Sequence, residues 1–224
     1  MEISSGGASV QERFLNKCML ANIYQLMLRL RGERNRLEVF IRWAAGPAIG
    51  GIKPASLVRL PRNGMDRAWD TWGKEICRTL DISAAHLRES SSGVLALLYR
   101  RCLLRRALKG PPGRYLRSLS YSVGAGLDSC LEHLANRFSD PDQFPHEVGV
   151  FLGYPLEDVV DFSAGKPSPY NCRGYWKVYH RPEKAKRAFA CMDRARLKMV
   201  GEFSRNFGGD SKILFPGIHI SLSS

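Results

Sequence analysis

An adjacent imidazole and carboxylate, His146 and Glu147, open a short apolar run that ends at Gly153-Tyr154-Pro155. A charge left unpaired among apolar residues is costly, so both side chains are expected to meet partners. Because imidazole titrates near neutral pH, the two suit general acid–base chemistry and are candidate catalytic residues. The structural alternative has Glu147 at the positive end of a helix and His146 bonded to backbone. Adjacent helical residues diverge by about 100°, which disfavours one pocket for both.

Two lysines and an arginine could hold an anion. Lys53 follows a loop rich in glycine and proline, residues 45–54, whose backbone N–H groups could assist in binding a phosphate or carboxylate. The loop lacks the Gly-Lys-Ser/Thr sequence of a P-loop. Arg100 ends an apolar run, and Lys177 lies among aromatic residues at 175–179. We expect Lys53, Arg100 and Lys177 to share an anion site; the alternative for Lys177 is a solvent-facing lysine lying over tyrosine.

Tyr154 is the fourth candidate ligand-binding residue, because its hydroxyl could reach a ligand. The alternative is a ring that packs in the turn and a hydroxyl that bonds to backbone. The sequence thus predicts a protein that binds a small anionic ligand where the loop at 45–54, the segment 144–154 and the segment 175–179 converge. It leaves open whether the protein is an enzyme, and no sequence pattern specifies a cofactor.

Basic residues cluster in two places and suggest a second function. Residues 100–117 hold seven arginines and lysines and no acidic residue, and the segment 184–198 holds six more. Together with a formal net charge of +13, they favour polyanions, anionic surfaces or acidic ligands as partners. A nucleic-acid-associated accessory protein is therefore an alternative, although no nucleic-acid-binding motif is present. The other alternative is a solvated basic surface with weak, salt-sensitive affinity.

A metal- or haem-handling protein is the third possibility, with His146 and either Cys172 or Cys191 as ligands. The six cysteines are far apart, form no CxxC pair and do not predict a zinc finger. Cys130 and His133 lie one helical turn apart, but no further ligands are nearby, so we assign no metal site. The chain also lacks a Gly-x-Ser-x-Gly elbow, a His-Glu-x-x-His pair and a dinucleotide fingerprint, which argues against common hydrolases, zincins and Rossmann enzymes.

The elements that would position these residues follow from periodicity and from breakers. We expect strands at 55–60, 93–99 and 175–179, with the continuously apolar run at 93–99 fully buried. Helices are expected at 66–80, 100–109, 113–120, 124–138, 145–152 and 182–207, and a further helix is expected to begin at Pro155. The result is an α+β fold, in which a small mixed or antiparallel sheet of about three strands is covered by helices.

The chain divides into four segments. Residues 1–8 are small and polar and predict a disordered terminus; 9–43 predict an N-terminal helical extension; 44–208 form the α+β domain; and 209–224 are a tail. No secretory signal is visible, and the apolar stretch 14–30 is interrupted by polar residues, so no membrane span is expected. We therefore predict a cytoplasmic protein with reduced thiols.

Four blocks, in this order, resemble a bacterial family of unknown function, the one numbered 3793: Gly51-Ile52-Lys53-Pro54-Ala55-Ser56-Leu57, Leu97-Leu98-Tyr99-Arg100, residues 144–159, and Gly174-Tyr175-Trp176-Lys177-Val178-Tyr179. The resemblance covers about residues 40–208 and implies a domain boundary, but no activity. It also implies cysteines just before Pro47 and near Ala195, which this chain lacks. A thiol site at those positions is therefore not expected here.

Overall fold

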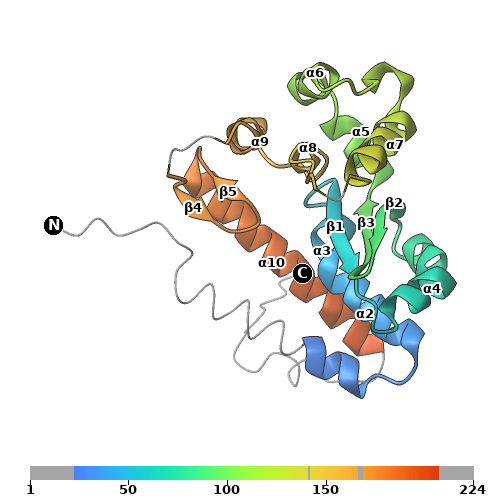
Figure 1. Cartoon of the computed structure of the whole chain (residues 1–224). Helices are drawn as coiled ribbons and strands as arrows, with labels where there is room; N and C mark the ends of the chain where they lie inside the picture. Colours follow the sequence, from blue (N-terminus) through green and yellow to red (C-terminus); the bar gives the residue numbers. More distant parts are fainter. Residues whose placement is uncertain (1–22, 141, 166–168, 207–224) are drawn as a thin grey trace.

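The computed structural model describes residues 23–140, 142–165 and 169–206, and Figure 1 shows their arrangement. A three-stranded antiparallel sheet has the order β1-β3-β2, with β1 at Ala55–Leu60, β2 at Ser83–Ser90 and β3 at Gly93–Tyr99. Ala55 pairs with Tyr99 on one side of β3, and Ser83 pairs with Tyr99 on the other. The α+β class and the strands at 55–60 and 93–99 are therefore confirmed.

The central strand β3 is buried on both faces, which explains its unbroken apolar sequence. Leu95, Leu97 and Tyr99 point into one hydrophobic core, whereas Val94, Ala96 and Leu98 point into the other. The first core is completed by α5 (Arg101–Ala107), α7 (Leu127–Phe138) and α8 (Val148–Phe151), and the second by α2 (Glu33–Ala44) and α4 (Met65–Thr79). Helices thus cover the sheet on both faces.

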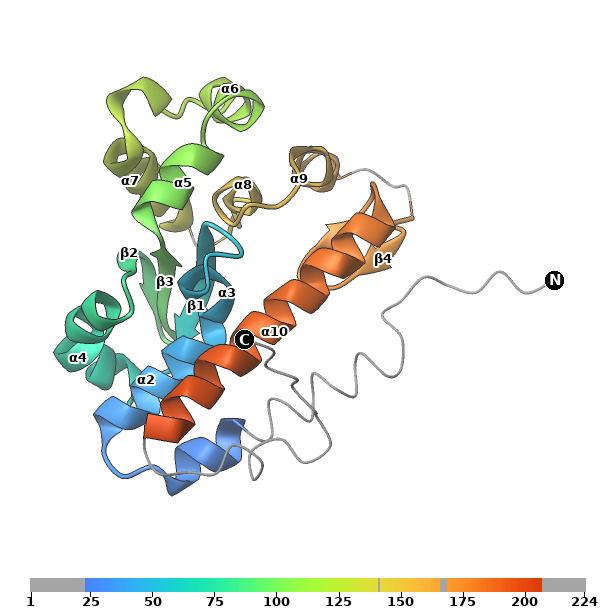
Figure 2. The same ribbon diagram turned by 180° about the vertical axis from the view of Figure 1, so that it is seen from behind.

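The remaining elements lie around this sandwich. They are α3 (Gly46–Ile49), α6 (Pro111–Ser118), a 3-10 turn at Val123–Ala125, α9 (Leu156–Ser163), the strands β4 (Cys172–Arg173) and β5 (Lys177–Val178), and α10 (Pro182–Asn206). In Figures 1 and 2, α10 runs diagonally from the β4–β5 hairpin to α2. None of the described helices is long and apolar enough to cross a bilayer.

The helix α2 of the predicted N-terminal extension packs on α10. Val39 and Trp43 share a buried cluster with Leu197, Val200 and Phe203. Residues 23–29 are helical as well, and Ile23 belongs to the same cluster. The predicted segments 1–8 and 209–224 lie outside the described residues. The described part of the extension therefore shares a core with the domain.

The prediction that 175–179 forms the third strand of the sheet is wrong. The third strand is β2, whereas Lys177–Val178 pairs with Cys172–Arg173 in a separate two-stranded hairpin. The physical reason lies in the backbone donors: the N–H groups of Tyr179 and His180 donate to the carboxylate of Asp158 instead of a neighbouring strand. The strand β2 was missed because it is an edge strand with a polar sequence, in which Leu87 is the buried apolar residue.

Three helix boundaries also differ from those predicted. The loop at 45–54 contains the short helix α3, since Pro47 is tolerated in a first helical turn. Pro111 likewise opens α6, which begins two residues before the helix predicted at 113–120. The helix predicted for 145–152 is helical only from Val148 to Phe151, with turns before it. The long C-terminal helix agrees with the prediction for 182–207 to within one residue.

Candidate functional site

Three segments that are distant in sequence meet beside α10. Gly153 has a φ of +75°, and a Cβ placed on it would lie 2.5 Å from Cδ of Pro54, so the turn after α8 rests directly on the loop before β1. The ring of Tyr154 then stacks against Trp176 of the hairpin, with 4.7 Å between ring centres. Gly174 allows an equally close approach, because a Cβ there would lie 2.3 Å from the Phe189 ring on α10. The backbone thus brings together the loop, the 144–154 segment and the 175–179 segment.

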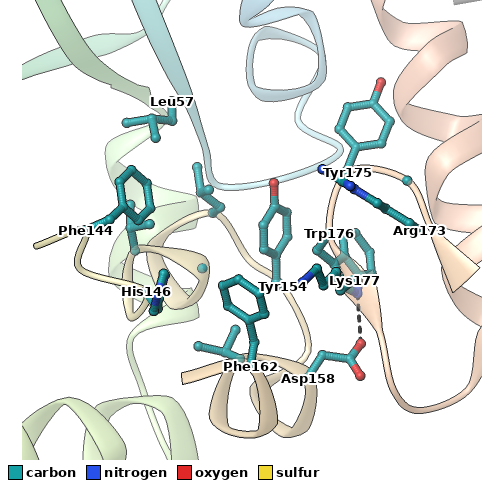
Figure 3. Close-up of a pocket in the computed structure, with 15 residues that line it drawn as sticks. Leu57, Phe144, His146, Tyr154, Asp158, Phe162, Arg173, Tyr175, Trp176 and Lys177 are labelled. Carbon is teal, nitrogen blue, oxygen red and sulfur yellow. Dashed lines mark hydrogen bonds between the residues drawn. The ribbon is translucent and has the colours of Figure 1, made fainter. Parts of the chain in front are cut away.

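A cavity of about 310 Å³ lies between α8, α9 and the β4–β5 hairpin (Figure 3). Its walls are mainly aromatic rings: Phe144, His146, Tyr154, Phe162, Tyr175 and Trp176. Small apolar side chains, Val148, Leu152 and Val159 among them, complete its inner surface. A volume near the lower end for ligand pockets, lined by rings, suits a flat molecule of one or two rings.

Asp158 borders the cavity, but its charge is already satisfied. Its side chain is buried and accepts hydrogen bonds from Nε1 of Trp176 at 2.8 Å and from the backbone N–H groups of Tyr179 and His180, both at 2.9 Å. Three donors spread the negative charge of a carboxylate and leave little attraction for another cation. Asp158 therefore fixes the hairpin and the indole ring that form one wall.

Two cations face the cavity without a carboxylate partner in the described residues. The Lys177 ammonium lies 5.0 Å from the centre of the Phe162 ring and 5.7 Å from that of Tyr170, which is a cation–π arrangement. Arg173, on β4, lines the same cavity and is exposed. With Asp158 satisfied, Lys177 and Arg173 give the cavity a net positive charge.

Behind Tyr154 lies a second cationic centre, formed by Lys53 and Arg196. The Lys53 side chain is buried, and its ammonium lies 5.4 Å from the centre of the Tyr154 ring. The Arg196 guanidinium lies 4.8 Å from the Tyr175 ring centre and 5.1 Å from that of Trp43. In the part of the chain described, no carboxylate pairs with either cation, and Nε of Arg196 is buried without a hydrogen-bond partner. The nearby Asp193 accepts instead from the Tyr175 hydroxyl at 2.6 Å.

Burial and the neighbouring charge of Arg196 lower the pKa of Lys53 to about 7. A lysine in such surroundings is partly neutral at physiological pH and is therefore a nucleophile as well as a cation. Burial also raises the pKa of Tyr154 to about 12, so its hydroxyl stays protonated. The centre thus combines an amine that is partly neutral, a permanent cation and a phenol.

Of the candidate catalytic pair, only His146 lies at the cavity. Its ring packs edge-on against Phe162, with 4.7 Å between centres, and its Nδ1 is buried without a hydrogen-bond partner. Glu147 does not line the cavity. Its carboxylate accepts from the Tyr121 hydroxyl at 3.1 Å and from Nε of Arg137 at 3.0 Å, in the core beside α7. The two side chains diverge, as adjacent residues on a helical turn do.

The four candidate ligand-binding residues are divided in a similar way. Tyr154 and Lys177 line the cavity, whereas Lys53 contacts the Tyr154 ring and does not line the cavity. Arg100 does not line the cavity: its Nη1 is 3.6 Å from a carboxylate oxygen of Asp81, and its backbone N–H donates to the carbonyl of Pro54, next to Lys53. Of the three cations predicted to share an anion site, Lys177 therefore lines the cavity, whereas Lys53 and Arg100 do not.

Four residues of the site, Arg196, Arg173, Phe162 and Asp158, were not predicted from the sequence. Arg196 and Arg173 were two among 34 basic residues, and nothing local marks them as partners of Lys53 or Lys177. A tertiary signal existed only in Gly153 and Gly174, whose missing side chains permit the close approaches described above. Those contacts become visible only in three dimensions.

Comparison with known proteins places the chain in a family. The model of the family described as protein of unknown function (DUF3793) matches residues 41–210, which is most of the chain. The chain belongs to this family. No curated protein and no solved structure matches it. All the cavity and cation residues described above lie inside the range that the DUF3793 model matches.

The described residues of this DUF3793 protein hold no cluster of side chains suited to a metal ion. Within residues 23–140, 142–165 and 169–206, no group of three or more His, Cys, Asp or Glu side chains is placed to hold a metal ion. Cys172 packs in a small apolar cluster with Val178 and Ala185, and Cys191 accepts from the Arg194 guanidinium. The metal- or haem-handling alternative therefore gains no observation in its favour.

Proposed function

We propose that the protein binds a small, flat, anionic ligand in the aromatic cavity between α8, α9 and the β4–β5 hairpin. One observation supports this most strongly: the cavity has aromatic walls and carries the cations of Lys177 and Arg173, while its carboxylate, Asp158, is satisfied by three donors. A ring would stack on Trp176, Tyr154 or Phe162, and an acidic group would pair with Lys177.

His146 supports the same proposal from the opposite wall. Its buried Nδ1 has no partner within the described residues, and a buried polar atom without a partner is unusual in a folded protein. A ligand oxygen or hydroxyl at this position would satisfy it. We assign His146 to ligand contact and leave Glu147 in its ion pair with Arg137.

The test uses matched anionic and neutral probes of the size of the cavity. Benzoate, phenyl phosphate and 2-naphthoate are titrated into the protein beside benzamide and 2-naphthamide, and binding is followed by tryptophan fluorescence and calorimetry. We expect saturable 1:1 binding, at least tenfold tighter for an anion than for its amide, which corresponds to about 1.4 kcal/mol. Equal affinity for acids and amides would remove the electrostatic part of the proposal.

Matched variants locate the binding. Lys177→Met should abolish the preference for anions, whereas Lys74→Met, the same charge change on an exposed residue of α4, should leave it unchanged. Trp176→Phe should remove the fluorescence response and retain most of the affinity. Loss of binding in Lys74→Met alone would place the site elsewhere.

A second candidate function is weak binding of nucleic acid by α5 and α6. Both helices carry exposed cations without a carboxylate partner in the described residues: Arg105, Arg106, Arg114 and Arg117, with Lys109 between the helices. Arg101 pairs with Asp128 and does not count among them. Affinity for a short DNA or RNA duplex should fall steeply with salt, and Arg105→Glu/Arg106→Glu should flatten that dependence. No binding at low salt would exclude this candidate.

A cytoplasmic location is part of the proposal. Cys77, Cys102, Cys130 and Cys191 are free thiols. Free thiols suit a reducing compartment. Alkylation of the protein in intact cells, before any oxidation on lysis, should modify exposed Cys102, and a disulfide there would contradict this location.

A further inference from the structure

The aromatic cavity does not account for the buried cationic centre behind it. Lys53 is 7% exposed, has no carboxylate partner in the described residues and lies beside the Arg196 charge. Burying a lysine beside a half-buried arginine without an anion is unfavourable, so a purely structural role for this pair is costly. Such an arrangement is more consistent with a function that uses an amine and a nearby permanent cation.

Lys53 has the features of an amine that reacts with carbonyl groups. Desolvation and a neighbouring cation are the two means by which proteins keep a lysine uncharged and nucleophilic. At neutral pH, a pKa of about 7 raises the neutral fraction on the order of a thousand-fold over a lysine with the ordinary value. The local geometry agrees, because the Lys53 amine rests against the face of a ring and lies in no ion pair among the described residues.

Arg196 supplies the complementary group. Its guanidinium is held by the rings of Trp43 and Tyr175, and its Nε lacks a hydrogen-bond partner. A guanidinium fixed in this way, with free donors and without an internal acid, is suited to a carboxylate. Lys53 and Arg196 therefore place a nucleophilic amine near a guanidinium that can bind a carboxylate.

Tyr154 connects this centre to the cavity. Its ring lines the cavity and lies 5.4 Å from the Lys53 ammonium, so one side chain separates a bound ligand from the amine. Tyr175 has the same double position, since it lines the cavity and contacts Arg196. Tyr154 and Tyr175 thus contact both the cavity and the two cations.

We propose that Lys53 forms an imine with the carbonyl group of a 2-oxo acid whose carboxylate pairs with Arg196. The neutral amine nitrogen adds to the carbonyl carbon as the C=O π bond breaks, and one of its two protons moves to the carbonyl oxygen, which gives a carbinolamine. The C–O bond then breaks and the C=N bond forms, and the hydroxyl leaves as water with the second nitrogen proton. Amine and ketone thus give imine and water without an oxidant or a reductant. This inference rests on the proposed function, because the 2-oxo acid reaches Lys53 from the aromatic cavity.

Reductive trapping tests the proposal. The full-length protein is incubated with phenylpyruvate and cyanoborohydride, and the adduct is located by tandem mass spectrometry. We expect a saturable adduct on Lys53 that forms at least tenfold faster than on exposed Lys74 or Lys184 in the same sample. Its rate should rise with pH with a midpoint near 7 at Lys53, and only at much more alkaline pH at the exposed lysines.

Variants separate the imine from simple binding. Lys53→Met should abolish the fast adduct, Arg196→Met should slow it at least tenfold, and Lys177→Met should leave the Lys53 chemistry in place but weaken entry. Tyr154→Ala, which opens the wall, should accelerate it. Because peptide mapping of the wild-type protein identifies the modified lysine by itself, the test does not depend on any variant folding.

Three outcomes test this inference separately from the proposed function. If phenylpyruvate binds in the cavity by fluorescence but no adduct forms on Lys53, the imine is refuted and the binding function stands. If adducts form only on exposed lysines, at equal rates, the imine is likewise refuted. If phenylpyruvate does not bind and no adduct forms, both proposals fail.

Discussion

The Lys53 ammonium lies 5.4 Å from the centre of the Tyr154 ring, inside the protein and without a carboxylate partner in the described residues. Tyr154 in turn stacks on Trp176, with 4.7 Å between ring centres. A buried amine, a phenol and an indole therefore stand in series between the loop before β1 and the β4–β5 hairpin. This series connects the two halves of the candidate site.

Stability should depend on pH through Lys53. Its pKa is lowered in the folded protein, so the folded state binds fewer protons than the unfolded chain between about pH 7 and 10.5. Stability from this residue is therefore lowest below pH 7 and rises as the pH increases through that window. Lys53→Met should raise Tm by several degrees near pH 6, and the gain should shrink toward pH 10. Paired thermal melts of both proteins check this, and a constant gain at every pH would contradict it.

Removing Asp158 should release the hairpin. Asp158→Ala leaves the Trp176 indole N–H and two backbone N–H groups without their acceptor, which costs on the order of 2–4 kcal/mol. Chemical denaturation measures the loss, and the emission of Trp176 should shift to the red as the ring becomes hydrated. Glu183→Ala, which removes an exposed ion pair with Lys186, should cost much less, because solvent screens an exposed pair. Equal costs would show that Asp158 does not hold the hairpin.

Glu147 should behave as a structural residue. Glu147→Ala leaves the buried Tyr121 hydroxyl and the Arg137 guanidinium without their acceptor and should cost about 2–4 kcal/mol of unfolding free energy. Ligand affinity should change little, because Glu147 does not line the cavity. His146→Ala should show the reverse pattern, with weaker binding and a small loss of stability. A large loss of affinity in Glu147→Gln, measured by calorimetry, would restore it to the catalytic pair.

The close contact at Gly153 should be intolerant of a side chain. Gly153 and Gly165 both have positive φ, at +75° and +63°, but only a Cβ on Gly153 would overlap Pro54. Both alanine variants bear the backbone strain, about 1 kcal/mol, and Gly153→Ala adds overpacking of about 1–3 kcal/mol. Denaturation of the two variants isolates the second contribution. Equal destabilisation would mean that the loop and the turn do not depend on this contact.

Local patterns predicted most of the scaffold. The unbroken apolar run at 93–99 identified the central strand, because a strand buried on both faces has a continuously apolar sequence. Hydrophobic periodicity and helix-breaking residues predicted the boundaries of α4 and α10 to within one residue. The edge strand β2 escaped because its polar side chains face water, and the 175–179 strand was misplaced because Asp158 takes its backbone donors.

The site was predictable only in part. The sequence marked Lys53, His146, Tyr154 and Lys177, and the structure brings their segments together around Gly153 and Pro54. The sequence could not show that Lys53 lies near Arg196, because the packing of α3 on α10 brings the two residues together. A Cβ on Gly46 of α3 would lie 2.8 Å from Cα of Arg196. Arg100 was marked as a cation that ends the apolar run at 93–99, yet its side chain turns to Asp81.

Mass spectrometry of small molecules released from the purified protein tests the central claim most directly. Wild-type protein and Lys177→Met are purified natively in parallel, denatured and analysed without a preselected target. The account predicts a flat anionic compound that is enriched in the wild-type sample and depleted in the variant. A compound retained equally by both proteins, or one that is uncharged, would contradict the claim that Lys177 and the aromatic walls form an anion-binding cavity.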